Sequence, residues 1–329
     1  MQNSSHDPGQ APSAGAAQRA AGVGIVLGIV FLLAQLLDFG SGRDQAIFAL
    51  VADAIQDGGA PYRDAWDFKT PGIYAVYHLA GTLFGPFLDN GEMAIRILEV
   101  GAILLSLLAF LILSRRFAGS LAAGLIGSLV ATLGWVELGY WHTGQPESFA
   151  VPLLAWAIVF STGKPRPEGS EFPAHLLAGA LYTAAALLKP PLGGGFLVSL
   201  VAVYLTRRRL LAPLFAFSLG ALSILATTLI WFASKGALDA LVDTLFRWTP
   251  NYTSLSIGLA ELPSALLRAT RTWLLGLSPF HAPGLVLLAI LPALTENERK
   301  ASLHILGVIA FSLVGVALQG KFFEYHFGA

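Results

Sequence analysis

Long apolar runs constrain the fold of this chain more than any other feature. A helix of roughly 17–25 apolar residues crosses the hydrocarbon core of a bilayer, which is about 30 Å thick. Several of these runs contain Gly or Pro, which membrane helices tolerate. The predicted spans are about 21–37, 95–114, 118–136, 148–162, 174–188, 193–206, 210–234, 272–293 and 301–318. The sequence therefore predicts an all-α polytopic integral membrane protein with about nine transmembrane helices.

The composition agrees with a membrane protein and excludes several kinds of site. Hydrophobic residues make up 55% of the chain and charged residues 12%, with a mean hydropathy of +0.67, whereas soluble domains are about 45–50% apolar and about 25% charged. The formal net charge is zero, so no bulk attraction to nucleic acid is expected. The sequence has no cysteine, which excludes disulfides and thiol catalysis. Its histidines form no close pair of the kind that binds zinc.

The orientation follows from the loops. Residues 1–20 are polar and small, and they predict a disordered cytoplasmic tail before a membrane domain over 21–329. The long first run and the absence of a basic start favour an uncleaved span over a signal peptide. Lys and Arg in alternate connections mark the cytoplasmic side. These cations are Arg19, Arg115 and Arg116, Lys164 and Arg166, Arg207 to Arg209, and Arg299 with Lys300.

The remaining connections are predicted to be extracytoplasmic. They span about 38–92, 137–147, 235–270 and 319–329. Much of the polar sequence therefore faces one compartment, which is the periplasm if the protein lies in a bacterial inner membrane. We expect the active face to be on this side.

The first of these loops concentrates the acidic residues. Eight of the chain's 20 acids lie in or beside it. DQAIFALVADAIQ has the apolar spacing of a helix, in which Asp44 shares a face with Phe48 and Val51 while Asp53 faces the other way. A second helix is predicted from Thr70 towards Phe84. Both helices are too short or too mixed in character to span and are expected to lie along the membrane interface.

The stretch GRDQAIFALVADAIQDGGAPYRDAWDFKTPG, with LFG after it, resembles the first extracytoplasmic loop of the GT-C glycosyltransferase superfamily. Within that superfamily, it resembles the protein O-mannosyltransferases and the lipid A aminoarabinose transferases. They place an Asp-Glu pair after the first span and a Lys-Pro-Pro element before the next helix. Asp44 occupies the first acidic position, and Lys69 with Pro71 occupies the second element. Gln45 and Thr70 depart from the pattern, and the neutral Gln45 weakens the case for a metal or a second acid there.

The resemblance implies a membrane-bound transferase. Such enzymes take a sugar from a polyprenyl-phosphate donor and transfer it, with inversion, to a lipid, polysaccharide or protein acceptor outside the cytoplasm. It implies no certain cofactor and leaves a divalent cation open. The reaction needs one base to accept the acceptor's proton, but little acid catalysis, because phosphate leaves as an anion.

Asp44 is the candidate base. The alternative is that Asp44 caps the N-terminus of its helix. Asp67 is a candidate substrate contact, with a structural or solvated role as the alternative, as for Asp53 and Asp64.

Isolated cations are the candidates for binding the departing phosphate. They are Lys69, Lys189 and Lys321, and the alternative is that they anchor helices at the membrane surface. Tyr325 and His326 are candidates for added hydrogen bonds to phosphate, or for residues of an aromatic belt.

Residues of the short outer loop GYWHTGQPESFA are candidates for sugar or acceptor contacts. They are His142, Gln145 and Glu147, and the alternative is a polar turn that caps the next helix. Arg247, Trp248 and Tyr252 are weaker candidates in the long outer segment.

Two other functions remain open at this point. One is a transporter or flippase of a polyprenyl-linked sugar or polar lipid, although transporters often show internal repeats and none is visible here. The other is a non-catalytic membrane subunit that is truncated, because the chain stops at FFEYHFGA without a returning helix.

Overall fold

The computed structural model describes residues 14–88, 90–162, 171–208, 210–254, 258, 260–276 and 278–319. Within these residues the chain forms helices joined by short connections, and no strand. The helices of the N-terminal half are α1 (Ala14–Leu36), α2 (Arg43–Gln56), α3 (Gly72–Phe84), η1 (Gly85–Phe87), α4 (Gly91–Phe117), α5 (Leu121–Glu137) and α6 (Pro146–Ser161). Those of the C-terminal half are α7 (Phe172–Leu188), η2 (Pro190–Gly194), α8 (Gly195–Arg207), α9 (Leu211–Ser234), α10 (Leu238–Val242), η3 (Asp243–Trp248), α11 (Thr249–Ser254), α12 (Leu262–Gly276), α13 (Ser278–Ile290), η4 (Leu291–Ala293) and α14 (Glu296–Gln319).

Local sequence signals fix several helix ends. The Asn90 side chain accepts a hydrogen bond from the backbone N–H of Glu92 and caps α4, and Ser120 caps α5 by accepting from Ala123. Such caps satisfy backbone donors that have no partner inside the helix. At the other end of α4, Arg115 and Arg116 occupy the last turn, where cations interact favourably with the helix dipole.

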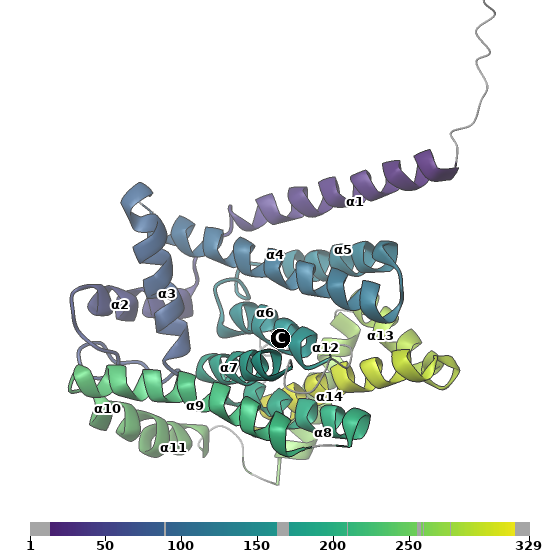
Figure 1. The fold of residues 1–329 in the computed structure, drawn as a ribbon. Coiled ribbons are helices and arrows are strands. Elements are labelled where there is room, and N and C mark those ends of the chain that lie inside the picture. The colour runs from purple at the N-terminus through teal and green to yellow at the C-terminus, as the bar shows by residue number, and fades with distance from the viewer. Residues whose placement is uncertain are drawn as a thin grey trace, which may run out of the picture.

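The main helices pack as a stack of neighbours. α1 packs on α5, α4 packs on both α5 and α6, α6 packs on α7, and α7 packs on α9. In Figure 1, α1 lies at the top, α4 and α5 lie below it, and α6, α7 and α9 follow towards the bottom. The largest apolar core lies where α2, α3, α4, α6, α7 and α9 meet and includes Phe48, Tyr74 and Phe217. A second core, with Leu36, Ile103 and Trp135, joins α1, α4 and α5.

Glycines bring α7 and α9 into close contact. A Cβ atom on Gly179 would lie 2.0 Å from the carbonyl oxygen of Phe217, and one on Gly220 would lie 1.9 Å from that of Leu176. Small residues at helix interfaces let backbones approach in this way, and membrane helices use them often. The N-terminal half of α7 is therefore packed closely against α9.

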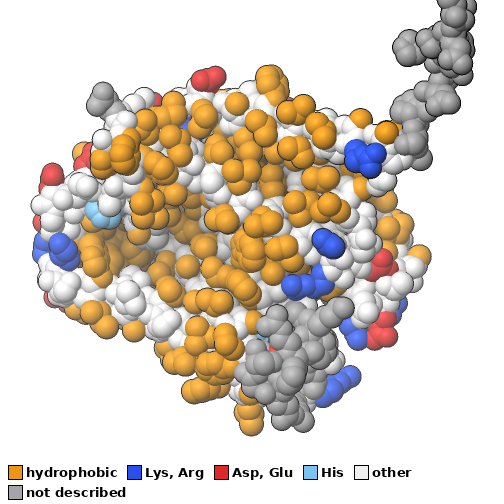
Figure 2. Space-filling model, turned by 45° about the horizontal axis from the view of Figure 1, so that its top comes forward, with side chains coloured by type: hydrophobic (Ala, Val, Ile, Leu, Met, Phe, Trp, Pro, Cys, Tyr) orange, Lys and Arg blue, Asp and Glu red, His pale blue; other side chains and the backbone are white. Residues whose placement is uncertain are grey.

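The surface is strongly apolar. Hydrophobic side chains cover most of the face in Figure 2, and exposed examples such as Phe31, Leu108 and Ile230 belong to α1, α4 and α9. An exposed patch of this extent is typical of membrane contact. Of the described helices, α1, α4, α9 and α14 are long and apolar enough to cross a bilayer. The all-helical prediction is confirmed, and these four helices support a membrane protein.

The predicted spans map onto helices, and one difference concerns the N-terminal tail. Residues 14–20, which the sequence predicts to be disordered, are helical and belong to α1, because Ala14, Ala16 and Ala17 favour helix formation. The predicted span at 272–293 covers the last residues of α12, which is described to Gly276, together with α13 and η4. The spans predicted at 118–136, 148–162, 174–188 and 193–206 coincide with apolar helices of 10–17 residues.

Both helices predicted in the first loop are present. α2 buries Phe48 and Val51 and exposes Asp53, as the periodicity predicts. α3 begins at Gly72 after Pro71 and packs against α2 and α4.

Candidate functional site

Segments that the sequence predicts to be extracytoplasmic meet at one end of the molecule. The Gln45 amide of α2 donates a hydrogen bond to the carbonyl of Thr143, between α5 and α6, at 2.7 Å. The Thr70 hydroxyl, before α3, donates to the carbonyl of Leu188 at the end of α7 at 2.8 Å. The Arg63 side chain donates to the carbonyl of Lys235, after α9. α2 and the connection that follows it therefore contact three other segments, and α2 and α3 lie at the left of Figure 1.

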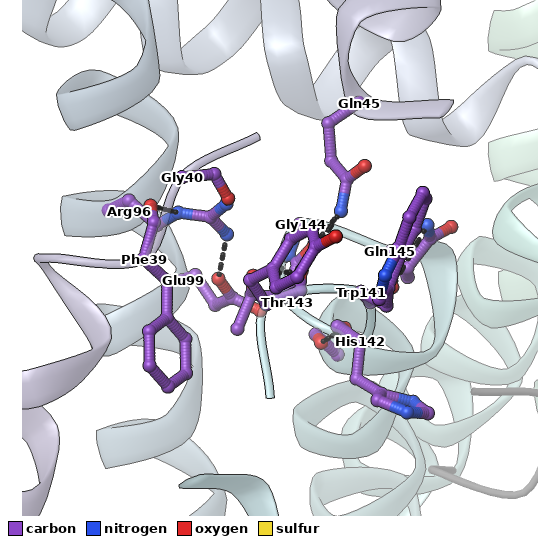
Figure 3. A network of polar contacts seen from close by, with 12 residues as sticks. Phe39, Gly40, Gln45, Arg96, Glu99, Trp141, His142, Thr143, Gly144 and Gln145 are labelled. Carbon is purple, nitrogen blue, oxygen red and sulfur yellow. Dashed lines mark hydrogen bonds and ion pairs between the residues drawn. The ribbon is translucent and has the colours of Figure 1, made fainter. Parts of the chain in front are cut away.

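A buried ion pair ties the α1–α2 connection to α4 (Figure 3). Arg96 and Glu99 are almost completely buried, and the Arg96 Nη1 donates to the Glu99 Oε2 at 3.1 Å. The other guanidinium nitrogens donate to the carbonyls of Phe39 at 3.1 Å and Gly40 at 2.8 Å. A buried charge is costly unless it is paired and hydrogen-bonded, so this network holds the chain that leads into α2 in one position.

The same network holds the loop before α6. The backbone N–H of Gly144 donates to the Glu99 Oε1 at 2.8 Å, and the Tyr77 hydroxyl of α3 donates to the Gly144 carbonyl at 3.0 Å. Gly144 has a φ of +67°, and a Cβ atom there would lie 2.6 Å from the Tyr77 hydroxyl. Both the backbone conformation and the space therefore require glycine.

Asp44 lies beside this network, in the first turn of α2. Its side chain is 19% exposed, and its Oδ1 lies 3.7 Å from the Nε of Arg43. The residue that caps α2 is Gly42, and no side-chain cap bond is made, so the capping alternative for Asp44 is wrong. Burial raises the pKa of the Tyr77 hydroxyl, and the negative charges of Glu99 and, more weakly, Asp44 raise it further. Asp44 is thus half-buried near Tyr77.

Lys189 forms a buried ion pair with Glu147 of α6. The two side chains are only 11% and 5% exposed, so Lys189 is not the surface anchor that the sequence left as an alternative. Burial lowers the pKa of Lys189, the charge of Glu147 opposes this, and the positive charge of Lys69 lowers it further. Two ammonium groups from separate segments therefore lie close enough to repel each other.

Lys69 lies against a cluster of aromatic rings. Its Nζ is 5.4 Å from the ring centre of Phe68, within the range of a cation–π contact. The aromatic cluster consists of Trp66, Phe68, Trp248 and Tyr252, with neighbouring ring centres 4.6–5.3 Å apart. Two of the weaker candidates, Trp248 and Tyr252, thus lie beside Lys69, whereas Arg247 is exposed and pairs with Asp243.

The other candidates of these loops are buried. Asp67 accepts a hydrogen bond from the Tyr74 hydroxyl at 2.9 Å, which supports its structural role. Gln145 is fully buried, and its Oε1 atom has no hydrogen-bond partner in the part of the chain that the structure describes. Burial lowers the pKa of His142 to about 4, while the charge of Glu147 acts in the opposite direction. His142, Gln145 and Glu147 are therefore buried, and they lie in the turn before α6 and in its first turn, with Gln145 at the N-cap position.

Three predicted phosphate ligands, Lys321, Tyr325 and His326, lie outside the described residues. Within those ranges, no group of three or more His, Asp or Glu side chains is arranged to hold a metal ion.

The sequence interpretation missed four residues of this site. They are Gln45, Tyr77, Arg96 and Glu99. A signal for two of them was available, because Arg96 and Glu99 are charges at the start of the apolar run 95–114, and ionisable residues inside a span are usually functional or paired. Nothing in the local sequence around Gln45 or Tyr77 indicates a partner in the loop near Gly144.

Comparison with known proteins assigns no family. No protein-family model, curated protein or solved structure matches this chain.

Proposed function

We propose that this chain is a GT-C-type membrane glycosyltransferase that uses a polyprenyl-phosphate sugar at the extracytoplasmic face. The observation that carries the proposal is that the hydrogen bond from the Thr70 hydroxyl to the Leu188 carbonyl joins the two segments on which Lys69 and Lys189 lie, at the end of the molecule that holds the half-buried Asp44. The proposal retains nine crossings, with the shorter apolar helices crossing beside the four long ones. It places the site on the periplasmic side of a bacterial inner membrane.

The two lysines suit a departing phosphate. Burial is the largest cause of the lowered pKa of Lys189, and Glu147 opposes it more strongly than Lys69 adds to it, so the cost of desolvating the ammonium is only partly offset. A phosphate bound at Lys69 and Lys189 would relieve the rest, and fixed cations stabilise negative charge that develops on a leaving group.

Asp44 suits the remaining chemical task. An acceptor hydroxyl attacks the anomeric carbon, the bond from that carbon to the phosphate oxygen breaks, and Asp44 takes the hydroxyl proton. The phosphate leaves as an anion, so no second carboxylic acid is needed, in contrast to glycosidases. The Arg96–Glu99 network fixes the chain just before α2 and so positions the carboxylate.

The aromatic cluster suits the apolar part of the donor. Trp66 and its neighbours form an apolar surface next to the Lys69 ammonium. A polyprenyl phosphate has the same arrangement, with a hydrocarbon chain joined to a charged head, so the chain would lie on the rings while the head meets the lysines.

The deciding experiment is sugar transfer by purified protein in lipid. A panel of radiolabelled polyprenyl-phosphate sugars is offered to the wild type, to Asp44→Asn and to the matched control Asp53→Asn, which changes an exposed acid on the opposite face of α2. We expect Asp44→Asn to lower turnover by about 10²–10⁴-fold without loss of donor binding, and Asp53→Asn to stay near the wild type. Equal turnover of Asp44→Asn and wild type would exclude Asp44 as the base. Donor that crosses the bilayer intact would instead establish a flippase.

A further inference from the structure

A cavity lies at the end of the helices opposite to the candidate functional site. It has a volume of about 410 Å³ and lies between the C-terminal ends of α4 and α6, α8 and the start of α14. Its lining includes Arg116, whereas the candidate site contacts α4 at Arg96. These two positions are about 30 Å apart along the helix at a rise of 1.5 Å per residue, so the cavity is a separate site.

The polar lining of the cavity is cationic. Arg116 and Lys300 line it, and no acidic side chain does in the part of the chain that the structure describes. Arg116 is fixed in place by hydrogen bonds to the carbonyl of Val159 at 2.7 Å and the hydroxyl of Thr162 at 3.2 Å. Lys300 is half-exposed and also pairs with Glu296, an exposed interaction of the kind that contributes little. The cavity therefore favours an anion.

Its inner wall carries a hydrogen-bonded polar group. His304 lines the cavity and is buried, and its Nε2 lies 2.7 Å from the Ser199 hydroxyl. The Ser161 hydroxyl, also in the lining, lies 3.4 Å from the same Ser199 oxygen. The Nδ1 atom of His304 is buried and has no hydrogen-bond partner in the described ranges. Such an atom is costly to leave unsatisfied.

The remaining walls are apolar and open outwards. Val201, Leu205 and Leu303 line the cavity, and each is more than half exposed. These residues continue the apolar surface that would face the hydrocarbon of a bilayer. A ligand can therefore enter sideways from the membrane and keep a hydrocarbon chain against these residues.

We propose that this cavity binds the headgroup of an anionic phospholipid, with its phosphate near Arg116 and Lys300 and an acyl chain along α8 and α14. Basic pockets between membrane helices on the cytoplasmic side commonly hold such headgroups, and alternate loops rich in Lys and Arg place this end there. The apolar opening favours a lipid over a soluble phosphate, because a soluble phosphate makes no use of these three side chains. The site does not depend on the proposed transferase activity.

The test is lipid binding by the full chain in detergent micelles, measured by native mass spectrometry. Phosphatidylglycerol is the probe, phosphatidylcholine the zwitterionic comparison, and glycerol 1-phosphate the soluble competitor. We expect phosphatidylglycerol to bind in preference to phosphatidylcholine and to resist displacement by glycerol 1-phosphate. Equal binding of the two lipids would refute the proposal, and full displacement by the competitor would reassign the cavity to a soluble phosphate.

Variants locate the site. Lys300→Gln removes one cation from the rim and should weaken phosphatidylglycerol binding about fivefold, the change expected for one cation near a lipid phosphate. Arg299→Gln, a neighbouring cation that does not line the cavity, is the matched control and should bind as the wild type does. Ala202→Phe fills the cavity and should abolish the preference for the anionic lipid. Unchanged binding in both Lys300→Gln and Ala202→Phe would show that the lipid binds elsewhere.

Discussion

At the scale of single residues, the Lys189–Glu147 pair carries two roles with different demands. Its burial makes it part of the packing between α6 and the end of α7, while the proposed chemistry uses the ammonium for phosphate. Substituting Lys189 alone, or Lys189 together with Glu147, can therefore distinguish the contribution of the pair to stability from its contribution to activity.

Lys189→Met should destabilise the protein by about 3–5 kcal/mol, because it leaves the Glu147 carboxylate buried without its partner. The double variant Glu147→Leu/Lys189→Met should be much less destabilised, since it removes both charges. The measurement is a double-mutant cycle on unfolding free energies in detergent. Free energies that simply add would show that the two charges do not interact.

The burial of His142 predicts a pH dependence of stability. Its pKa in the folded protein is about 4, below the usual 6.5, so between these values the unfolded state binds more protons. His142 should therefore cost no stability above about pH 6.5, and about 3 kcal/mol should be lost as pH falls towards 4.

Thermal unfolding of the wild type and His142→Gln across pH 4–8 checks this. His142→Gln should lack the loss of stability that protonation of His142 causes at low pH. His78→Gln, a control in α3, should lose stability at low pH as the wild type does. Parallel curves for the wild type and His142→Gln would contradict the prediction.

The sequence predicted correctly which side chains are buried where the spacing of apolar residues along a helix determines it. The apolar spacing of 44–56 placed Phe48 and Val51 inside and Asp53 outside, as observed. It did not predict that Gln45 would be buried, because Gln45 is buried by hydrogen bonds to a loop almost 100 positions later in the chain. The pairing of Lys189 with Glu147 was missed for the same reason.

At the scale of helices, the contact between α7 and α9 depends on glycine. Gly179→Ala should destabilise the protein by about 1–3 kcal/mol, because its Cβ would clash with the Phe217 backbone carbonyl and overpacking on that scale forces the helices apart. The same substitution at Gly101 in α4, where nothing lies within 4 Å of a Cβ atom, is the control. It should leave the stability unchanged or raise it by about 0.5–1 kcal/mol.

Chemical denaturation in mixed micelles compares the two variants directly. A loss in Gly101→Ala as large as that in Gly179→Ala would trace the effect to helix propensity or to the micelle, and not to the helix contact.

Helix positions were largely predictable, and helix ends less so. Most predicted spans coincide with helices to within a few residues, because apolar runs and the polar loops between them are both local signals. The helical start of the tail at residues 14–20 was not expected, since small and polar residues next to Gly and Pro do not determine where a helix begins.

At the scale of the whole molecule, the topology is open to direct labelling because the chain has no native cysteine. Asp57→Cys, just after α2, should react with a membrane-impermeant maleimide added outside intact cells. Arg115→Cys, at the other end of α4, should react only after the membrane is permeabilised. Both native side chains are exposed, so neither change should disturb the fold, and labelling of both from the same side would rule out a crossing by α4.

The most useful prediction for the whole molecule was the assignment of several loops to the same side of the membrane. It placed the first loop, the loop at 137–147 and the segment after α9 in one compartment, and hydrogen bonds join the first loop to each of the others. It could not predict which atoms meet, because the charge of loops determines the side of the membrane and contains no information on tertiary contacts. The cavity near His304 likewise arises from the packing of four helices and has no local signature.

The Arg96–Glu99 network also has a consequence for synthesis and membrane insertion. Arg96 and Glu99 lie one turn apart on α4, so they can neutralise each other if that helix enters a bilayer, where an unpaired charge is costly. Their other partners come from chain made earlier, at Phe39 and Gly40, and from chain made later, at Gly144. We expect the position of α4 to become fixed only after the loop before α6 has been synthesised, because Gly144 supplies one of these hydrogen bonds.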